Sequence, residues 1–205
     1  MDFDDKAKKW DTQDRGLRAV AIADELEMAI AGETYHKALE FGCGTGLVSF
    51  NLQHLLREIT LVDSSAEMIK VLKNKIRDNR IHNMAAYTLD IVKGESLPGR
   101  YDLIYMSMAL HHIFDTGKIL GTLSVNMDPD GLICIVDLLE MENDFHKSEP
   151  DFVGHNGFKP EHLQILLEGA GFVDIKHRMI YEGVKKADEG EFPYSLFLMT
   201  AKKEE

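Results

Sequence analysis

The sequence predicts an α/β protein in which a doubly wound, mostly parallel sheet carries helices on both faces. Short apolar runs alternate along the chain with longer amphipathic stretches, the pattern expected of strands and of the helices that cover them. A glycine-rich stretch at residues 42–46 separates the first apolar run from the helical pattern that follows it. The apolar run at residues 132–137 is continuous, as expected for a strand buried on both faces of a parallel sheet.

The expected strands are short runs rich in apolar residues. They cover residues 37–41, 59–62, 85–89, 101–106 and 132–137. A strong turn signal, Asp128-Pro129-Asp130-Gly131, precedes the last of these runs. Two further strands, at residues 172–181 and 193–202, are expected to pair antiparallel through a polar loop at residues 185–191.

The expected helices carry apolar residues at helical spacing. They cover residues 15–31, 46–56, a stretch that begins near Ala66, residues 118–126, and a stretch that begins after Pro160. Ser64 or Ser65 can cap the helix that begins near Ala66. Glycine at Gly169 and Gly171 can end the last helix.

The domain organisation is expected to be simple. Without an internal repeat or a domain boundary, residues 1–205 are expected to form one domain. Residues 1–35 would form an N-terminal lid and helix. Residues 138–160 lack regular periodicity and are rich in acidic residues, so they are expected to form an irregular segment on the substrate side of the sheet.

Composition limits the classes of function. The chain has 205 residues, 44% hydrophobic and 28% charged, with a formal net charge of −12. Nucleic-acid binding needs a basic surface that displaces counterions from phosphates, and lysine and arginine form only short clusters here. No apolar run reaches the roughly 20 residues that span a bilayer, and the first residues lack the pattern of a signal peptide. We therefore expect a cytoplasmic protein, a monomer or homodimer, whose partner is a small molecule and not nucleic acid or a membrane.

Cysteine and metal chemistry are not expected. Cys43 and Cys134, the two cysteines, lie in a predicted ligand loop and a predicted buried strand. Two thiols far apart in sequence favour neither a disulfide framework nor a zinc site. The histidines and acids show no spacing that is diagnostic of a metal site, so we expect no metal.

The glycine-rich stretch follows an acidic residue and reads Glu40-Phe41-Gly42-Cys43-Gly44-Thr45-Gly46. A glycine loop between a strand and a helix places a small-molecule site at the carboxyl edge of a parallel sheet. In the dinucleotide fingerprint GxGxxG the third glycine comes three residues after the second, and Leu47 occupies that position here. This departure disfavours an NAD(P)-dependent oxidoreductase, which stays an alternative.

The pattern E-x-G-x-G-x-G resembles the first motif of the class I S-adenosylmethionine-dependent methyltransferases. Later segments are similar to that family in order and spacing: Asp63 to Met68, Leu89-Asp90-Ile91, Tyr101 to Met106, Ala109 to His112, and the lead-in residues Phe3-Asp4 and Lys9-Trp10-Asp11. The set covers most of the chain and resembles the members that act on small molecules. The resemblance implies a Rossmann-like methyltransferase fold, with seven strands and an antiparallel last strand between the fifth and the sixth.

The resemblance also implies S-adenosylmethionine as the cofactor. Glu40 would engage its α-ammonium and Asp63 its ribose hydroxyls, although nicotinamide enzymes place an acid where Asp63 lies. Met68 would pack on the adenine or in the core, and Asp90 would reach the adenine amino group. The expected cofactor residues are Glu40, Gly42, Cys43, Gly44, Gly46, Asp63, Ser64, Met68, Asp90, Ile91, Met106 and Ser107.

His111 and His112 follow the fourth strand and are the expected catalytic residues, with His112 preferred; a structural role for both stays open. Transfer to an O, N or C atom of a small molecule would be a direct displacement, and a base is needed only if the acceptor atom is protonated. Trp10, the sole tryptophan, and His155 are the expected substrate contacts, and a solvated loop histidine is the alternative for His155. A module that binds the cofactor without turnover is a further alternative.

Overall fold

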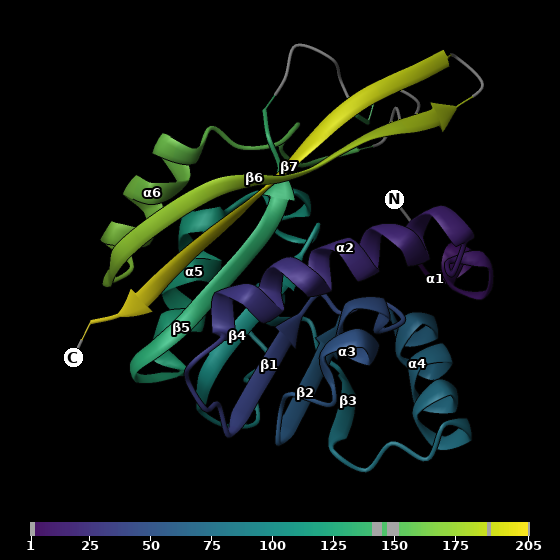
Figure 1. Ribbon diagram of the computed structural model, residues 1–205, viewed down its shortest axis with the longest axis horizontal. Coiled ribbons are helices and arrows are strands. Elements are labelled where there is room, and N and C mark those ends of the chain that lie inside the picture. The colour runs from purple at the N-terminus through teal and green to yellow at the C-terminus, as the bar shows by residue number, and fades with distance from the viewer. Residues whose placement is uncertain (1–2, 141–144, 147–151, 188–189, 205) are drawn as a thin grey trace.

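One mixed sheet of seven strands organises the computed structural model, which describes residues 3–140, 145–146, 152–187 and 190–204. The strand order across the sheet is β3-β2-β1-β4-β5-β7-β6 (Figure 1). The strands are β1 (Lys37–Phe41), β2 (Glu58–Asp63), β3 (Met84–Thr88), β4 (Tyr101–Ser107), β5 (Met127–Leu138), β6 (Phe172–Ala187) and β7 (Gly190–Lys203).

Strand direction confirms the predicted topology. β1 pairs parallel with β2 and β4, and β3 and β5 extend this parallel set on either side. β7 lies between β5 and β6 and is antiparallel to both. At the carboxyl edge, Phe41 of β1 is level with Val62 of β2 and Met106 of β4. The turns that follow these strands therefore share one edge of the sheet, where the predicted site residues lie.

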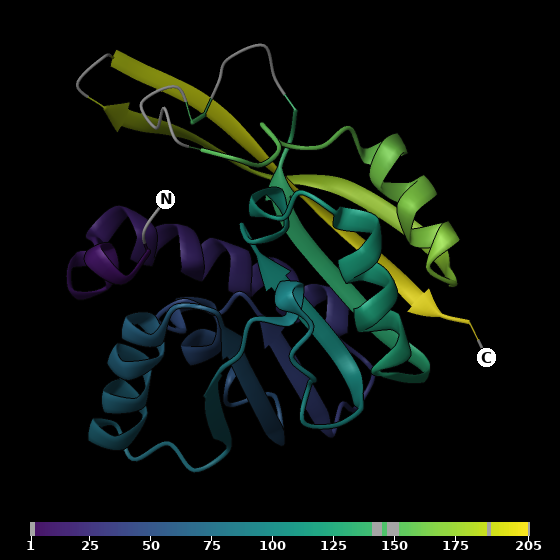
Figure 2. The same cartoon turned by 180° about the vertical axis from the view of Figure 1, so that it is seen from behind.

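Helices cover both faces of the sheet (Figures 1 and 2). They are α1 (Phe3–Lys6), η1 (Ala7–Lys9), α2 (Gln13–Ile30), α3 (Leu47–Leu52), α4 (Ala66–Asp78), η2 (Ile91–Lys93), η3 (Leu110–His112), α5 (Thr116–Val125) and α6 (Pro160–Gly169). One buried cluster joins α2, α3 and α4 to the sheet, and a second joins α5 and α6 to its other face. Alternate residues of β4 enter the two clusters, Tyr105 the first and Ile104 the second. Within the described ranges, no helix is long and apolar enough to cross a membrane.

The helix predicted over residues 46–56 is shorter than expected. α3 ends at Leu52, and residues 53–55 form a turn. Asn83, just before β3, donates its side-chain amide to the carbonyl oxygens of Gln53 and Leu56, at 2.7 and 2.8 Å. These bonds satisfy carbonyl groups near the helix end that would otherwise need water. A residue thirty positions away therefore supports the end of α3.

The loop predicted at residues 185–191 is instead largely part of a long β-hairpin. Lys185 pairs with Phe192 and Lys186 with Glu191, whose carboxylate lies 3.9 Å from the Lys186 ammonium. The polar composition that indicated a loop is that of an exposed strand pair carrying opposite charges. In Figure 1 this hairpin extends beyond the carboxyl edge of the sheet, over the first part of α2. Arg18 of α2 donates to the Tyr194 hydroxyl at 3.1 Å, and this bond links the hairpin to α2.

The predicted irregular segment, residues 138–160, is described only in part. Residues 141–144 and 147–151 lie outside the described residues. At its ends, Leu139 and Phe158 form a parallel bridge, and the Phe158 amide donates to the Leu138 carbonyl at 2.8 Å. The segment therefore leaves the end of β5 and returns to it at the carboxyl edge.

Candidate cofactor and acceptor site

The glycine loop after β1 adopts a backbone that only glycine takes readily. Gly42, Gly44 and Gly46 all have positive φ, at 68°, 52° and 77°. A Cβ on Gly42 would lie 2.5 Å from the Cβ of Ala109, and one on Gly46 would lie 2.6 Å from Leu72. Packing therefore leaves no room for a Cβ on Gly42, whereas at Gly46 the end of the Leu72 side chain could shift and the positive φ is what favours glycine. At Gly44 the nearest atom to a Cβ position is the indole Nε1 of Trp10, at 3.6 Å, so Trp10 is in van der Waals contact with this face of the residue.

Asp63, the last residue of β2, holds the loop in place. Its carboxylate accepts the Gly44 amide at 2.8 Å and the Ser65 amide at 2.9 Å. Burial raises the pKa of Asp63, and the negative charge of Asp4 adds to the rise, while the amide bonds oppose it. The predicted acid thus lies directly beside Gly44.

Glu40 is turned into the sheet. Only 3% of it is exposed, and its carboxyl accepts the Ser49 hydroxyl, whose oxygen lies 2.5 Å from the Tyr105 hydroxyl. Burial raises the pKa of Glu40 to about 8, so the group is mostly protonated at neutral pH. The structure therefore places this carboxyl in a buried network with α3 and β4. Its predicted contact with an α-ammonium stays a prediction.

The other predicted cofactor residues lie at the same edge but differ in exposure. Ser64 is exposed, whereas Met68 and Met106 are buried, at 1% and 0% exposure. Asp90 caps η2 by accepting the Lys93 amide at 3.1 Å, and the same lysine lowers the pKa of Asp90. Burial raises the pKa of the Cys43 thiol well above its usual value, which keeps the thiol unreactive.

The N-terminal segment, residues 3–12, covers the loop. Asp11 accepts the Thr45 hydroxyl at 2.5 Å and pairs with the Lys75 ammonium at 2.8 Å. Asp4 accepts the hydroxyl of Ser65, the residue that caps α4, at 2.5 Å. Trp10 lies over Gly44, and the Arg15 guanidinium sits 4.0 Å from the centre of the Trp10 ring system. Figure 1 shows α1 beside α4, next to the carboxyl edge.

His111 and His112 have different surroundings. His111 is 1% exposed, and its Nδ1 lies 2.5 Å from a carboxylate oxygen of Asp137, which is fully buried at the end of β5. Within the described part of the chain, we find no hydrogen bond to the ring of His112. Burial lowers the pKa of His112 to about 2, with His111 and His146 contributing. The two histidines therefore differ, because His111 pairs with a buried carboxylate and His112 does not; the catalytic role expected of both, with His112 preferred, stays a prediction.

A series of aromatic rings connects the glycine loop to these histidines. Phe3 packs edge-on against Trp10 and His112, at ring-centre distances of 5.8 and 5.1 Å. On the far side, Phe152 lies 5.4 Å from His112 and stacks on His146 at 3.6 Å. These rings pack against one another between the loop and the described part of residues 138–160.

His155 lies where η3 leads into α5. Its Nε2 is 3.2 Å from the Thr116 hydroxyl and 3.1 Å from the Phe114 carbonyl, and its amide donates to the His111 carbonyl at 2.7 Å. These bonds hold η3 and the start of α5 together. The predicted substrate contact of His155 stays a prediction.

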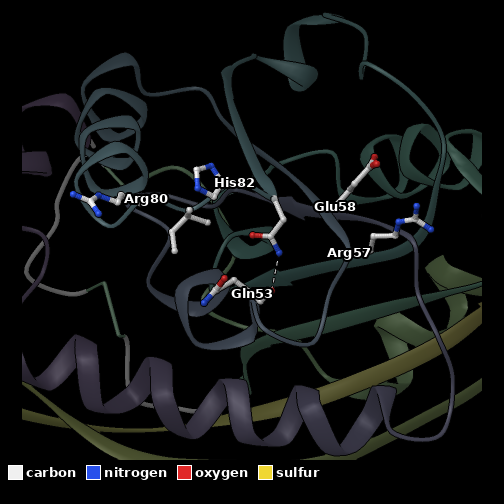
Figure 3. Close-up of a pocket in the computed structure, with 7 residues that line it drawn as sticks. Gln53, Arg57, Glu58, Arg80 and His82 are labelled. Atoms are coloured by element: carbon white, nitrogen blue, oxygen red, sulfur yellow. Dashed lines mark hydrogen bonds between the residues drawn. The ribbon is translucent and has the colours of Figure 1, made fainter.

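A separate hollow lies at the other edge of the sheet (Figure 3). It is lined by Gln53, Arg57, Glu58, Arg80, Ile81, His82 and Asn83. Glu58 begins β2 and Asn83 precedes β3, so the hollow is at the amino ends of these strands, away from the glycine loop. The described residues hold no cluster of three or more histidine, cysteine or acidic side chains with metal-binding geometry.

Comparisons with known proteins indicate the family that the chain resembles. Residues 39–133 match a family model described as a methyltransferase domain. These residues are a methyltransferase domain. Together with the fold, this match confirms the resemblance to the class I S-adenosylmethionine-dependent methyltransferases.

Two relatives of the chain come from the fission yeast Schizosaccharomyces pombe. An uncharacterized methyltransferase, C1347.09, is 32% identical over 146 residues, covering 64% of this chain and 51% of that protein. The mitochondrial ubiquinone biosynthesis O-methyltransferase is 25% identical over 142 residues, covering 65% and 52%. The chain thus spans about half the length of these curated relatives.

Solved structures share the fold of the chain. YcgJ from Bacillus subtilis has a TM-score of 0.73 at 16% identity, covering 89% of this chain and 98% of that one. The N-methyltransferase NodS from Bradyrhizobium japonicum, solved with S-adenosylhomocysteine, has a TM-score of 0.67 at 17% identity, covering 94% and 87%. The [4+2]-cyclase SpnF has a TM-score of 0.71 at 14% identity, covering 90% and 81%. At such identities the likeness shows the fold alone.

The methyltransferase domain does not contain the whole site. Residues 39–133 include the glycine loop, Asp63 and both histidines, whereas Asp4, Asp11 and Asp137 lie outside them. Sequence reasoning assigned no role to these three acids. The signal available for Asp4 and Asp11 was their place in the lead-in that resembles the family, and for Asp137 it was the end of an apolar strand.

Proposed function

We propose that the chain transfers the methyl group of S-adenosylmethionine to a small-molecule acceptor. The observation that carries the proposal is the face of Gly44, free of a Cβ and covered by Trp10, beside the Asp63 carboxylate, which accepts the Gly44 amide at 2.8 Å. A main chain without a Cβ lets a ligand lie against it, and an acid at this position suits ribose hydroxyls. The family match and the Rossmann-like fold support the same reading.

The residues at the edge suit this cofactor. Each oxygen of Asp63 accepts one amide, and a carboxylate offers about four acceptor positions, so room remains for two hydroxyl groups. We assign the glycine loop (Gly42 to Gly46, with Cys43) to the methionine and ribose portion, with Glu40 at its ammonium end. Asp90 and the Ile91 amide are assigned to the adenine edge. The remaining cofactor contacts assigned from sequence are Ser64, Met68, Met106 and Ser107.

The cofactor supplies a methyl group on a sulfonium, which is already a good leaving group. The chain has to position the acceptor in line with that group and exclude water. The N-terminal segment suits both tasks, because Trp10 lies over the face of Gly44 that the ligand would use. We infer that residues 3–12 lift to admit the cofactor and close over it, which is the lid role expected for this part of the chain.

Alternative functions are less well supported. An NAD(P)-dependent oxidoreductase would need the third glycine at the position of Leu47. A module that binds the cofactor without turnover would keep the loop and Asp63 but would have no need for a proton-handling group. The buried pair His111–Asp137 favours an enzyme. The net charge of −12 supports a small molecule over nucleic acid as the methyl acceptor. A cytoplasmic location and a monomeric or homodimeric state stay proposals.

Calorimetric titration with S-adenosylmethionine, S-adenosylhomocysteine and NAD tests the proposal. Wild type should bind the first two and not NAD, and Gly44→Ala should raise the Kd for S-adenosylmethionine at least about tenfold, which is about 1.4 kcal/mol. Gly121→Ala is the matched control, because Gly121 lies in α5 with open space around its Cβ position. Binding of NAD in place of S-adenosylmethionine would contradict the proposal. So would unchanged affinity in Gly44→Ala.

A further inference from the structure

A buried carboxylate–imidazole pair lies beside the proposed cofactor site. The two side chains are 1% (His111) and 0% (Asp137) exposed, and the Nδ1–oxygen distance is 2.5 Å. Asp137 also accepts the His111 main-chain amide at 3.1 Å and the Leu138 amide at 2.7 Å. A carboxylate that accepts from several donors acts as a pure acceptor. Nδ1 of His111 therefore carries the proton, and its Nε2 is left with a bare lone pair.

The Nε2 atom of His111 has no hydrogen-bond partner among the described residues, although it is buried. Buried polar atoms without partners are uncommon in folded proteins, and catalytic sites are one place where they occur. Rings surround the imidazole: its centre lies 4.1 Å from that of His112, 5.2 Å from His146 and 6.3 Å from Phe152. A planar acceptor that reached Nε2 would therefore contact aromatic side chains.

The pair is close to the loop that would hold the cofactor. Ala109, two residues before His111, faces Gly42 so closely that a Cβ on Gly42 would lie 2.5 Å from the Ala109 Cβ. On the other side, Phe3 links His112 to Trp10, which lies over Gly44. His111 is thus positioned between the methyl donor's proposed site and the rings of His146 and Phe152.

We propose that His111, oriented by Asp137, is the base that removes the proton from a hydroxyl group on an aromatic acceptor. The inference rests on the proposed function and names its acceptor class, a phenol. The acceptor oxygen forms a bond to the methyl carbon while the carbon–sulfur bond breaks, and that electron pair passes to sulfur and cancels its positive charge. The hydroxyl proton goes to Nε2, and the resulting imidazolium is balanced by the Asp137 carboxylate. Asp137 is a positioning residue in this scheme.

The choice of a phenol follows from proton affinities. Proton transfer is efficient when the donor and the base have similar pKa values. A phenolic hydroxyl, with a pKa of about 10, is far closer to the range in which imidazoles titrate than a hydroxyl such as that of water, at about 15.7. A neutral amine needs no base to attack a methyl group, so the pair would be superfluous for an amine acceptor.

The first test determines which ring nitrogen of His111 carries the proton in the wild-type protein. In full-length protein labelled with ¹⁵N-histidine, NMR should show His111 with a proton on Nδ1 and none on Nε2. The resonances are assigned by their loss in His111→Asn. In Asp137→Asn, the amide can donate to Nδ1, so the proton should move to Nε2. A wild-type His111 protonated on Nε2 overturns the proposal, and this measurement needs neither cofactor nor acceptor.

The second test measures methyl transfer to simple phenols, such as catechol, alongside the matching anilines. Wild type should methylate phenols and not anilines. His111→Asn keeps a donor for Asp137 and should lower kcat at least about 100-fold, with the Kd for S-adenosylmethionine within about twofold of wild type. Asp137→Asn should shift the pH profile of kcat, and Asp137→Glu should restore part of the rate. His162→Asn, on the exposed side of α6, is the control and should match wild type.

The outcomes separate this inference from the proposed function. If wild type fails to bind S-adenosylmethionine, the proposed function fails, and the NMR result still decides whether His111 offers a bare nitrogen. If wild type binds the cofactor but methylates anilines alone or no phenol, the inference is overturned while cofactor binding stands. Full turnover by a folded His111→Asn variant also overturns it. If Asp137→Asn does not fold, the NMR of wild type and the kinetics of His111→Asn decide the question.

Discussion

The carboxylate of Asp11 accepts a hydrogen bond from the hydroxyl of Thr45, in the middle of the glycine loop, at 2.5 Å. The same acid pairs with Lys75, whose ammonium also donates to the Thr45 carbonyl at 2.9 Å. One residue of the N-terminal segment thus connects the loop to α4. The charged side chain of Asp11 therefore links the N-terminal segment to the glycine loop. Closure of this segment over the loop can be tested by replacing that side chain.

Removing the charge of Asp11 should loosen the N-terminal segment. Asp11→Asn loses the ion pair with Lys75, and because both groups are partly exposed we expect a modest effect, about threefold to tenfold in the Kd for S-adenosylmethionine. Hydrogen exchange at residues 3–12 should accelerate, while exchange in the sheet stays unchanged. Asp14→Asn, three residues further along on an exposed site, is the control. Unchanged exchange in Asp11→Asn would show that this acid does not hold the segment.

Replacing Asp63 should weaken cofactor binding at least about tenfold, because charge-assisted bonds to the ribose hydroxyls would be lost. Asp63→Ala also frees the Gly44 amide, so a second variant, Asp63→Asn, keeps the shape while removing the charge. Calorimetry with S-adenosylmethionine measures both, with the exposed Asp78→Asn as control. If both Asp63 variants bind as tightly as wild type, the assignment of this acid is wrong.

Glu40 should make the fold less stable as pH rises. Its pKa is about 8 in the folded chain against an ordinary value of 4.5, so between these values the folded state retains a proton that the unfolded state has lost. The free energy of unfolding should therefore fall by up to about 1.4 kcal/mol per pH unit over this window. Urea unfolding from pH 5 to 8 should show this slope in wild type and in the exposed control Glu27→Gln, and a flatter one in Glu40→Gln. Parallel slopes for all three would contradict the burial of an uncharged Glu40.

His112 should make the fold less stable as pH falls. Because its pKa is lowered to about 2, the folded state stays neutral where the unfolded chain, with an ordinary value of 6.5, takes up a proton. Stability from this group is complete above pH 6.5 and is lost as pH falls below it, by up to about 1.4 kcal/mol per unit. Urea unfolding between pH 4 and 7 should show a smaller loss for His112→Phe than for wild type or for the exposed control His162→Gln. An equal loss in all three would mean that His112 is protonated in the folded state.

Much of the fold could be predicted because its signals are local. The alternation of apolar runs and helical patterns fixes strands and helices, and the glycine loop with Asp63 follows from residues close in sequence. The length of α3 could not be predicted, because its end depends on Asn83. The extent of the β6–β7 hairpin depends on cross-strand pairs such as Lys186 with Glu191. The polar composition of this stretch is equally typical of a loop and of an exposed strand pair, so it could not predict the pairing.

The site was harder to predict where it joins distant segments. His111 was chosen from its motif, but its partner Asp137 comes 26 positions later, at the end of the neighbouring strand. Only the parallel register of β4 with β5, which sets Ser107 beside Val136, brings the two together. Asp4 and Asp11 were read as part of a lead-in pattern; their bonds to Ser65 and Thr45 require the folded chain.

The position of Trp10 has a practical consequence. It is the chain's one tryptophan, and its indole lies against the Arg15 guanidinium and over Gly44. Its intrinsic fluorescence should therefore change when a ligand enters or when residues 3–12 lift away. The protein thus contains its own optical reporter of occupancy, one that allows stopped-flow recording and acceptor screening without an attached dye.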